Sequence, residues 1–154
     1  MKSQNLVHLF QAASAGEIYS YLADLRKFVS IHPFMKTATV IAQPTPQQTV
    51  FHITETAILL GFIPYPVVYD ATVTETESDK TVEYFSDIKK MIQLAIHWRV
   101  EKTSPGEITV FEKVEVTGNK LLSGVFIKLL AKAHLKSMEN LKLKLKNVSE
   151  NHPI

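Results

Sequence analysis

Two ionisable residues, Glu112 and His134, occur where the sequence pattern predicts apolar neighbours. Glu112 is in phase with Ile108, Val110 and Val114 in an alternating stretch. Successive side chains of a strand point to opposite faces, so Glu112 is expected to point inward. His134 falls on the apolar stripe of the last predicted helix. A carboxyl group in an apolar interior has a raised pKa and can act as an acid or a base, or can hold a ligand hydroxyl. Glu112 and His134 are therefore the candidate catalytic residues.

Each candidate also has a purely structural interpretation. Glu112 can lie at a bulge or at a pocket mouth, where it is hydrated or paired with Arg99 or a lysine. His134 can be a hydrogen-bonded core histidine, can donate to a ligand, or can pair with Glu112. The chain's 6 histidines show no i,i+4 pair and no other spacing typical of metal ligands. We therefore predict no metal site and no cofactor.

The elements that position these residues are mainly strands. The stretch 4–12 predicts a first strand with Leu6, His8 and Phe10 on one face. Later alternation, broken by turn residues rich in proline, glycine, serine and aspartate, predicts six more. These strands are expected at 36–43, 48–59, 66–77, 81–88, 91–103 and 107–117. The short connections favour an antiparallel meander.

Two short helices are predicted after the first strand. Ser14 and Glu17 form a capping box, in which each side chain can bond the other residue's amide. The helix that follows has Ile18, Tyr21, Leu22 and Leu25 at helical spacing and is expected to end near residue 26. A second helical turn is expected over 27–31, before Pro33.

The last predicted element is a long helix over 121–148. Its core stripe alternates four- and three-residue spacings, and three further apolar residues widen it. The stripe is Ile127, Ala131, His134, Met138, Leu141, Leu145 and Val148, with Leu122, Phe126 and Leu130 beside it. Such a helix must bury its apolar face against the sheet. A long antiparallel sheet curls, and one helix does not fill its concavity, so we expect a pocket between them.

The order of these elements resembles the superfamily of START, birch-pollen-allergen-like and polyketide cyclase (SRPBCC) domains, which have the helix-grip fold. The resemblance rests on the helix with Ile18, Tyr21 and Leu22, on Asp24-Leu25, on His32-Pro33 before the next strand, and on the long last helix. It implies an α+β fold in which about seven strands curve around the C-terminal helix. A competing fold is the cystatin-like cone of the nuclear-transport-factor type, whose helices usually come first.

The resemblance implies that a lipid, sterol, polyketide or other hydrophobic molecule binds in the pocket. Side chains on the inward faces of the strands and of the last helix are the candidate contacts. For the strand over 48–59 we take the face of Phe51, Ile53 and Glu55 as inward, rather than that of His52 and Thr54. The candidate ligand-binding residues are Phe51, Ile53, Tyr69, Tyr84, Leu94, Ile96, Trp98, Val110, Glu112, Phe126, Leu130 and His134.

Three functions remain open at this point. The first is a non-catalytic carrier or sensor of a small hydrophobic ligand. The second is a cyclase- or dehydratase-like enzyme that uses Glu112 and His134. The third is an interaction module with a vestigial pocket, for which a homodimer is expected. The apolar loop 59–66 around Phe62, and a ridge formed by Lys128, Lys132 and Lys136, are candidate sites of transient membrane contact.

The composition of the chain bears on its domain number, its partners and its location. The 154 residues fit one domain, which we place at 1–149, with a frayed tail at 150–154. A formal net charge of +2 gives no reason to expect a nucleic-acid partner. The chain has 0 cysteines, no continuous apolar stretch typical of a signal peptide, and none long enough to span a membrane. We therefore expect a cytoplasmic protein.

Overall fold

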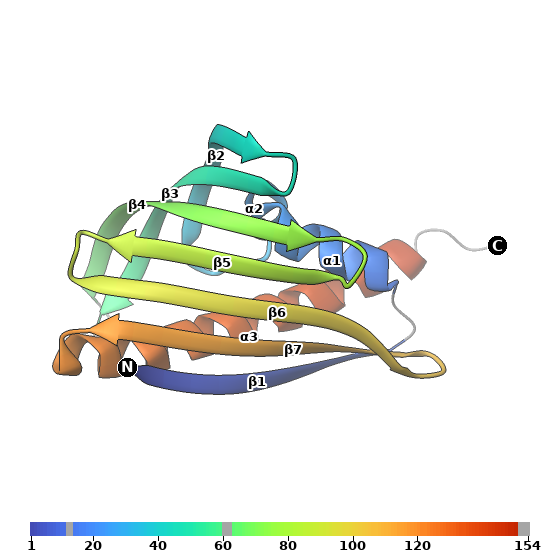
Figure 1. The fold of residues 1–154 in the computed structure, drawn as a ribbon. Coiled ribbons are helices and arrows are strands. Elements are labelled where there is room, and N and C mark those ends of the chain that lie inside the picture. Colours follow the sequence, from blue (N-terminus) through green and yellow to red (C-terminus); the bar gives the residue numbers. More distant parts are fainter. Residues whose placement is uncertain (12–13, 60–62, 151–154) are drawn as a thin grey trace.

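The computed structural model describes residues 1–11, 14–59 and 63–150 of the chain. A seven-stranded antiparallel sheet and three helices form this part (Figure 1). The elements are β1 (Lys2–Gln11), α1 (Ala15–Ala23), α2 (Leu25–Phe28), β2 (Met35–Thr45), β3 (Gln48–Leu59), β4 (Ile63–Thr76), β5 (Thr81–Ile88), β6 (Ile92–Ser104), β7 (Glu107–Gly118) and α3 (Lys120–Glu150). This is the predicted α+β order, with every predicted strand present.

The sheet is a meander with one exception. Its strand order is β1-β7-β6-β5-β4-β3-β2, so the first and last strands of the chain lie side by side at one edge. Glu112 of β7 therefore has two neighbours: Leu6 of β1 and Trp98 of β6 are its register partners. This pairing brings the inward residues of β1 within reach of Glu112, which the order of elements alone does not reveal.

The two short helices meet at Asp24. The Ser14 hydroxyl accepts from the Glu17 amide, so this half of the predicted capping box is confirmed. The helix ends at Ala23 rather than near residue 26, because Asp24 is extended and its carboxylate accepts the Arg26 amide, which begins α2. The second helical turn is consequently Leu25–Phe28 instead of 27–31.

The helices cover different parts of the same sheet face (Figure 1). The long helix α3 packs on β1 and β7, whereas α1 packs on β4, β5 and β6, and α2 packs on β2. The buried residues of the predicted stripe on α3 include Ile127, Met138 and Leu141. The core lies between these helices and the inner face of the sheet, and so does the candidate site.

None of the three helices in the described part of the chain has the apolar length that crossing a bilayer requires. The helix α3 ends at Glu150, two residues beyond the predicted end. The rest of the predicted frayed tail lies outside the described residues.

Candidate functional site

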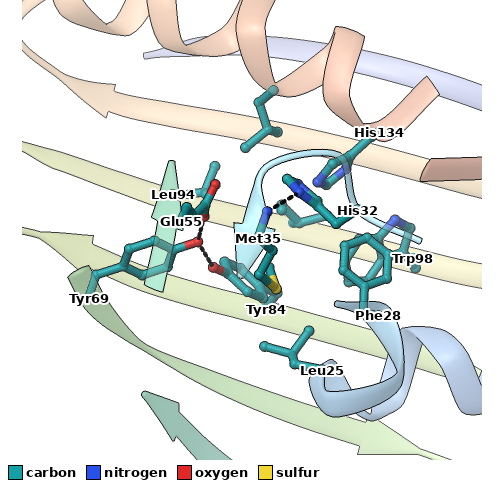
Figure 2. A pocket seen from close by; sticks show the side chains of 12 residues that line it. Leu25, Phe28, His32, Met35, Glu55, Tyr69, Tyr84, Leu94, Trp98 and His134 are labelled. Carbon is teal, nitrogen blue, oxygen red and sulfur yellow. Dashed lines mark hydrogen bonds between the residues drawn. The ribbon is translucent and has the colours of Figure 1, made fainter. Parts of the chain in front are cut away.

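A small cavity lies between α2, α3 and the inner face of the sheet (Figure 2). Its volume is about 20 Å³, which is room for one water-sized group. The wall is mostly apolar, but five ionisable side chains also reach it. The lining residues are Leu25, Phe28, His32, Met35, Glu55, Tyr69, Tyr84, Leu94, Ile96, Trp98, Leu130 and His134.

A buried carboxylate with two histidine partners lies behind one wall of the cavity. Glu112 is 2% exposed, and its Oε1 accepts from Nε2 of His8 at 2.9 Å. Its Oε2 accepts from Nδ1 of His134, which is buried as well. His8 comes from β1, Glu112 from β7 and His134 from α3, so this His8–Glu112–His134 cluster joins the sheet edge to the helix. Of its three members, only His134 lines the cavity.

The pKa of Glu112 shows what these partners do. Burial by itself raises the pKa of a carboxyl group, because it disfavours the charged form. Here the positive charges and hydrogen bonds of His134 and His8 outweigh burial and lower the pKa of Glu112 to about 2. The expectation that the pKa of Glu112 is raised is therefore wrong. At neutral pH Glu112 is an anion that accepts from both imidazoles.

The alternative pairings of Glu112 are wrong as well. Arg99 points to the outer face of the sheet, where its guanidinium lies 4.6 Å from the centre of the Phe111 ring and its Nε lies 3.4 Å from Glu101. No lysine within the described residues pairs with Glu112. The expected inward orientation, in contrast, is confirmed by the burial of Glu112.

Aromatic rings hold His134 in place. The Trp98 indole stacks on the His134 ring at 5.6 Å with an angle of 27° between their planes, and Phe28 meets it edge-on at 5.8 Å. His32 approaches it at 6.0 Å, nearly perpendicular. Stacked and edge-to-face contacts of this kind stabilise one orientation of a ring. His134 is thus fixed by Glu112 on one nitrogen and by three rings around it.

A second polar cluster occupies the opposite wall (Figure 2). The Tyr69 hydroxyl donates to Oε2 of Glu55, and the Tyr84 hydroxyl donates to the Tyr69 oxygen at 3.2 Å. These residues come from β3, β4 and β5, which are adjacent in the sheet. Burial raises the pKa of Glu55, and the opposing effects of Tyr69 and His134 offset this rise only in part. Glu55 therefore holds its proton to a higher pH than an exposed glutamate does.

Comparison with known proteins supports the fold. No family model matches the sequence, and no curated protein matches it. Solved structures do match. A START superfamily protein from Mycobacterium smegmatis has a TM-score of 0.71 at 13% sequence identity, and the match covers 95% of this chain and 98% of that one. The Zhui aromatase/cyclase from Streptomyces sp. R1128 has a TM-score of 0.65 at 10% identity, over 97% of this chain and 94% of that one.

The chain has the helix-grip fold. The resemblance inferred from the sequence is therefore confirmed at the level of the fold, and the cystatin-like cone is wrong. At such low identities the likeness carries no residue roles from those proteins to this chain. The chemistry of this helix-grip cavity must be argued from its own side chains.

Seven of the predicted ligand-binding residues reach the helix-grip cavity, and five do not. Those that line it are Tyr69, Tyr84, Leu94, Ile96, Trp98, Leu130 and His134. Phe51, Ile53 and Val110 face inward as predicted but are buried in the core away from the cavity. Phe126 is half-buried against that core. Glu112 does not line the cavity, because His134, to which it is hydrogen-bonded, lies between them.

The five lining residues that sequence reasoning missed come mainly from the α1–β2 segment. They are Leu25, Phe28, His32, Met35 and Glu55. The alternation of β3 did place Glu55 on the inward face with Phe51 and Ile53, and this signal could have nominated it. His32 had no such signal, because it lies in a connection whose path depends on the packing of α2.

The two candidate surfaces for membrane contact are described only in part. Residues 60–62, with Phe62, lie outside the described residues, while Tyr65 on β4 is exposed, with the Lys89 ammonium 5.9 Å from its ring. Lys128, Lys132 and Lys136 are exposed on α3 as expected. Lys136 pairs with Glu139 at 3.6 Å. Membrane contact by either surface stays a prediction.

Proposed function

We propose that this protein binds a small, mainly apolar molecule between the sheet and α3, with the polar group of the ligand in the cavity. The observation that carries the proposal is the convergence of His32, Glu55, Tyr69, Tyr84 and His134 on one enclosed space. An apolar pocket with a few convergent polar groups and perturbed pKa values is the common form of a ligand site. The fold supports it, since START superfamily proteins and an aromatase/cyclase share this architecture.

The size of the cavity sets a condition on this proposal. A volume of about 20 Å³ holds the polar head of a ligand and not its apolar body. Binding must therefore move side chains of the wall. Leu130 and Met35 are suited to this, since they are unbranched at Cβ and belong to α3 and to the beginning of the edge strand β2. We expect a ligand to displace these two first.

Native mass spectrometry of the purified protein, followed by organic extraction, tests this function. A discrete, stoichiometric apolar adduct is the expected result, and its mass identifies the ligand class. A matched pair of variants locates it: Leu130→Trp places an indole into the cavity, and Leu135→Trp places one on the exposed face of the same helix. Loss of the adduct in both variants, or in neither, would argue against this cavity as the site.

Acid–base catalysis is a second candidate function, and the Glu112–His134 hydrogen bond favours it. A base that is oriented by a third group is the usual arrangement of an activated side chain. Nε2 of His134 would take a proton from a carbon next to a ligand carbonyl, and the electron pair would pass to the carbonyl oxygen as an enolate. Glu112 would stabilise the imidazolium that forms. This is the cyclase- or dehydratase-like alternative, with Glu112 in a positioning role.

Deuterium exchange tests this alternative without knowledge of the natural substrate. Acetophenone carries an acidic methyl group next to its carbonyl, and NMR in heavy water follows the loss of its methyl protons. Catalysis predicts faster exchange with the wild-type protein than with His134→Asn, in which the amide can still donate to Glu112. Equal rates would contradict a catalytic role for His134 and would leave the binding proposal standing.

A second copy of the chain and a membrane surface are the two partners that the proposal includes besides the ligand. An interaction module with a filled interior predicts a stable dimer, which sedimentation velocity detects. Membrane contact through the lysine ridge predicts weaker binding to anionic liposomes when Lys128, Lys132 and Lys136 are changed to glutamate. Unchanged liposome binding would argue against the ridge. A chain with 0 cysteines forms no disulfide and is compatible with a reducing compartment, and a cytoplasmic location stays part of the proposal.

A further inference from the structure

His32 lines the cavity, and its ring carries one N–H group. Its Nδ1 accepts two backbone hydrogen bonds, from the amide of Phe34 at 3.0 Å and from that of Met35 at 2.9 Å. A nitrogen that accepts carries a lone pair, so the proton of the neutral ring is on Nε2. Burial and the nearby His134 lower the pKa of His32 to about 3, which keeps the ring neutral. His32 is therefore a fixed donor at the cavity wall.

His134 presents the opposite group. Its Nδ1 donates to the Glu112 carboxylate, which can only accept. In the neutral ring the lone pair is consequently on Nε2, the nitrogen that has no hydrogen-bond partner among the described residues. The centres of the His32 and His134 rings lie 6.0 Å apart, and both line the cavity. No hydrogen bond joins them.

Trp98 adds a second donor without a partner. Its side chain is 1% exposed and lines the cavity, yet the indole Nε1 makes no hydrogen bond to any described residue. A buried donor that stays unpaired costs free energy comparable to a lost hydrogen bond. The indole stacks on His134, so the indole lies beside one of the two histidines.

We infer that the cavity binds the hydroxyl group of an apolar alcohol or phenol, which accepts from Nε2 of His32 and donates to Nε2 of His134. A hydroxyl oxygen has two lone pairs, so it can also accept from Nε1 of Trp98. One such group satisfies two donors and one acceptor at once, which neither a hydrocarbon nor an ether does. This inference rests on the proposed function and specifies the chemistry of the ligand's polar group.

Three one-ring probes separate the hydroxyl from the apolar body. Phenol accepts and donates, anisole only accepts, and toluene does neither, while all three have similar size. Trp98 is the chain's 1 tryptophan, so the single indole peak in a proton–nitrogen NMR spectrum reports on the cavity directly. We expect all three probes to shift this peak, with phenol about tenfold tighter than toluene and anisole between them.

Asparagine variants assign the hydrogen bonds. In His32→Asn the side-chain oxygen can still accept the two amides, but the shorter side chain places no donor at the position of Nε2, so phenol and anisole should weaken several-fold. In His134→Asn the amide can still donate to Glu112, but the shorter side chain places no acceptor at the position of Nε2, so phenol should fall to the level of anisole. Toluene affinity should hold in both variants, which shows that they fold. His97→Asn, on the exposed outer face, is the matched control and should change nothing.

The outcomes separate the two proposals. Equal affinities of phenol and toluene, each with a shift of the Trp98 peak, would overturn the hydroxyl site and leave ligand binding intact. A preference for phenol that survives in both asparagine variants would also overturn it. If no probe shifts the Trp98 peak up to its solubility limit, the cavity does not admit even one ring, and the proposed function fails together with this inference.

Discussion

The two polar clusters beside the cavity are each built on a buried glutamate, and the pKa values of the two glutamates shift in opposite directions. Glu112 and Glu55 both point to the inner face of the sheet, and burial raises the pKa of each carboxyl group. Glu112 has two imidazole partners, which lower its pKa to about 2. Glu55 has a tyrosine hydroxyl, and its pKa stays above the usual range. The partners of a carboxyl group, and not its burial alone, decide the direction in which its pKa shifts.

The two clusters also differ in how many of their side chains line the cavity. The His8–Glu112–His134 cluster ties β1, β7 and α3 together, and it reaches the cavity only through His134. All three members of the Glu55–Tyr69–Tyr84 cluster line the cavity. We therefore expect the first cluster to matter more for stability and the second to matter more for ligand contact.

The largest expected effect is that of Glu112→Gln. Glutamine removes the charge that strengthens two buried hydrogen bonds and keeps only one acceptor oxygen for two imidazole donors, so we expect a loss of about 3–5 kcal/mol in the free energy of unfolding. Glu55→Gln is the matched control, and it should change the free energy of unfolding by less than about 1 kcal/mol, since the amide oxygen can still accept from Tyr69. Urea unfolding measures both values. Equal costs for the two variants would show that the clusters do not differ.

The dependence of stability on pH should have opposite signs in the two clusters. The pKa of Glu112 in the folded state lies below its usual value of 4.5, so its stabilisation is present above pH 4.5 and is lost as the pH falls toward about 2. The pKa of Glu55 lies above 4.5, so the folded state loses stability as the pH rises from 4.5 through that pKa. Urea unfolding at several pH values checks this.

Two variants test which glutamate causes each part of this pH dependence. Glu112→Gln should flatten the loss of stability in acid, and Glu55→Gln should flatten the loss on the rising side. An acid loss that is as steep in Glu112→Gln as in the wild type would contradict the assignment to Glu112.

Tyr69→Phe should have an intermediate effect. The Tyr69 hydroxyl both donates to Glu55 and accepts from Tyr84, so its removal leaves two buried groups unpaired. We expect a loss of about 1–3 kcal/mol in the free energy of unfolding. Tyr65→Phe, at an exposed position of the same strand, should change it very little. A loss in Tyr69→Phe no greater than in Tyr65→Phe would mean that this cluster does not stabilise the fold.

The smallest effect is expected at an exposed histidine–carboxylate pair. Nδ1 of His52 lies 2.7 Å from the Asp70 carboxylate on the outer face, where the two side chains are 45% and 56% exposed. Exposed pairs of this kind contribute about 0–1 kcal/mol. Asp70→Asn should therefore cost less than about 1 kcal/mol by urea unfolding. A cost close to that of Glu112→Gln would show that burial does not make the His8–Glu112–His134 cluster more stabilising than an exposed pair.

The sequence was a good guide to the elements and to Glu112, for local reasons. Turn residues mark the strand ends, and strict alternation in β7 places Glu112 among buried valines. The same alternation put His8 on the inner face of β1. That His8 and Glu112 meet could not be read from the chain, because it depends on β1 pairing with β7, more than a hundred residues away.

The cavity itself was less predictable. Alternation shows which side chains point inward, but not which of them pack tightly and which face a space. Phe51 and Ile53 are packed, whereas Glu55, two residues further along β3, lines the cavity. His32 and Phe28 were missed because α2 begins at the Asp24 cap and directs the following segment over the sheet. Such features depend on tertiary packing.

The most direct test of this account is a pH titration of the glutamate side-chain carboxyl carbons by NMR, with Glu112→Gln and Glu55→Gln to assign the two signals. The Glu112 signal should stay in its ionised position down to about pH 3, while the Glu55 signal should titrate above 4.5. Two signals that titrate together near 4.5 would contradict it, because the histidine partners would then not lower the pKa of Glu112 and burial would not raise that of Glu55.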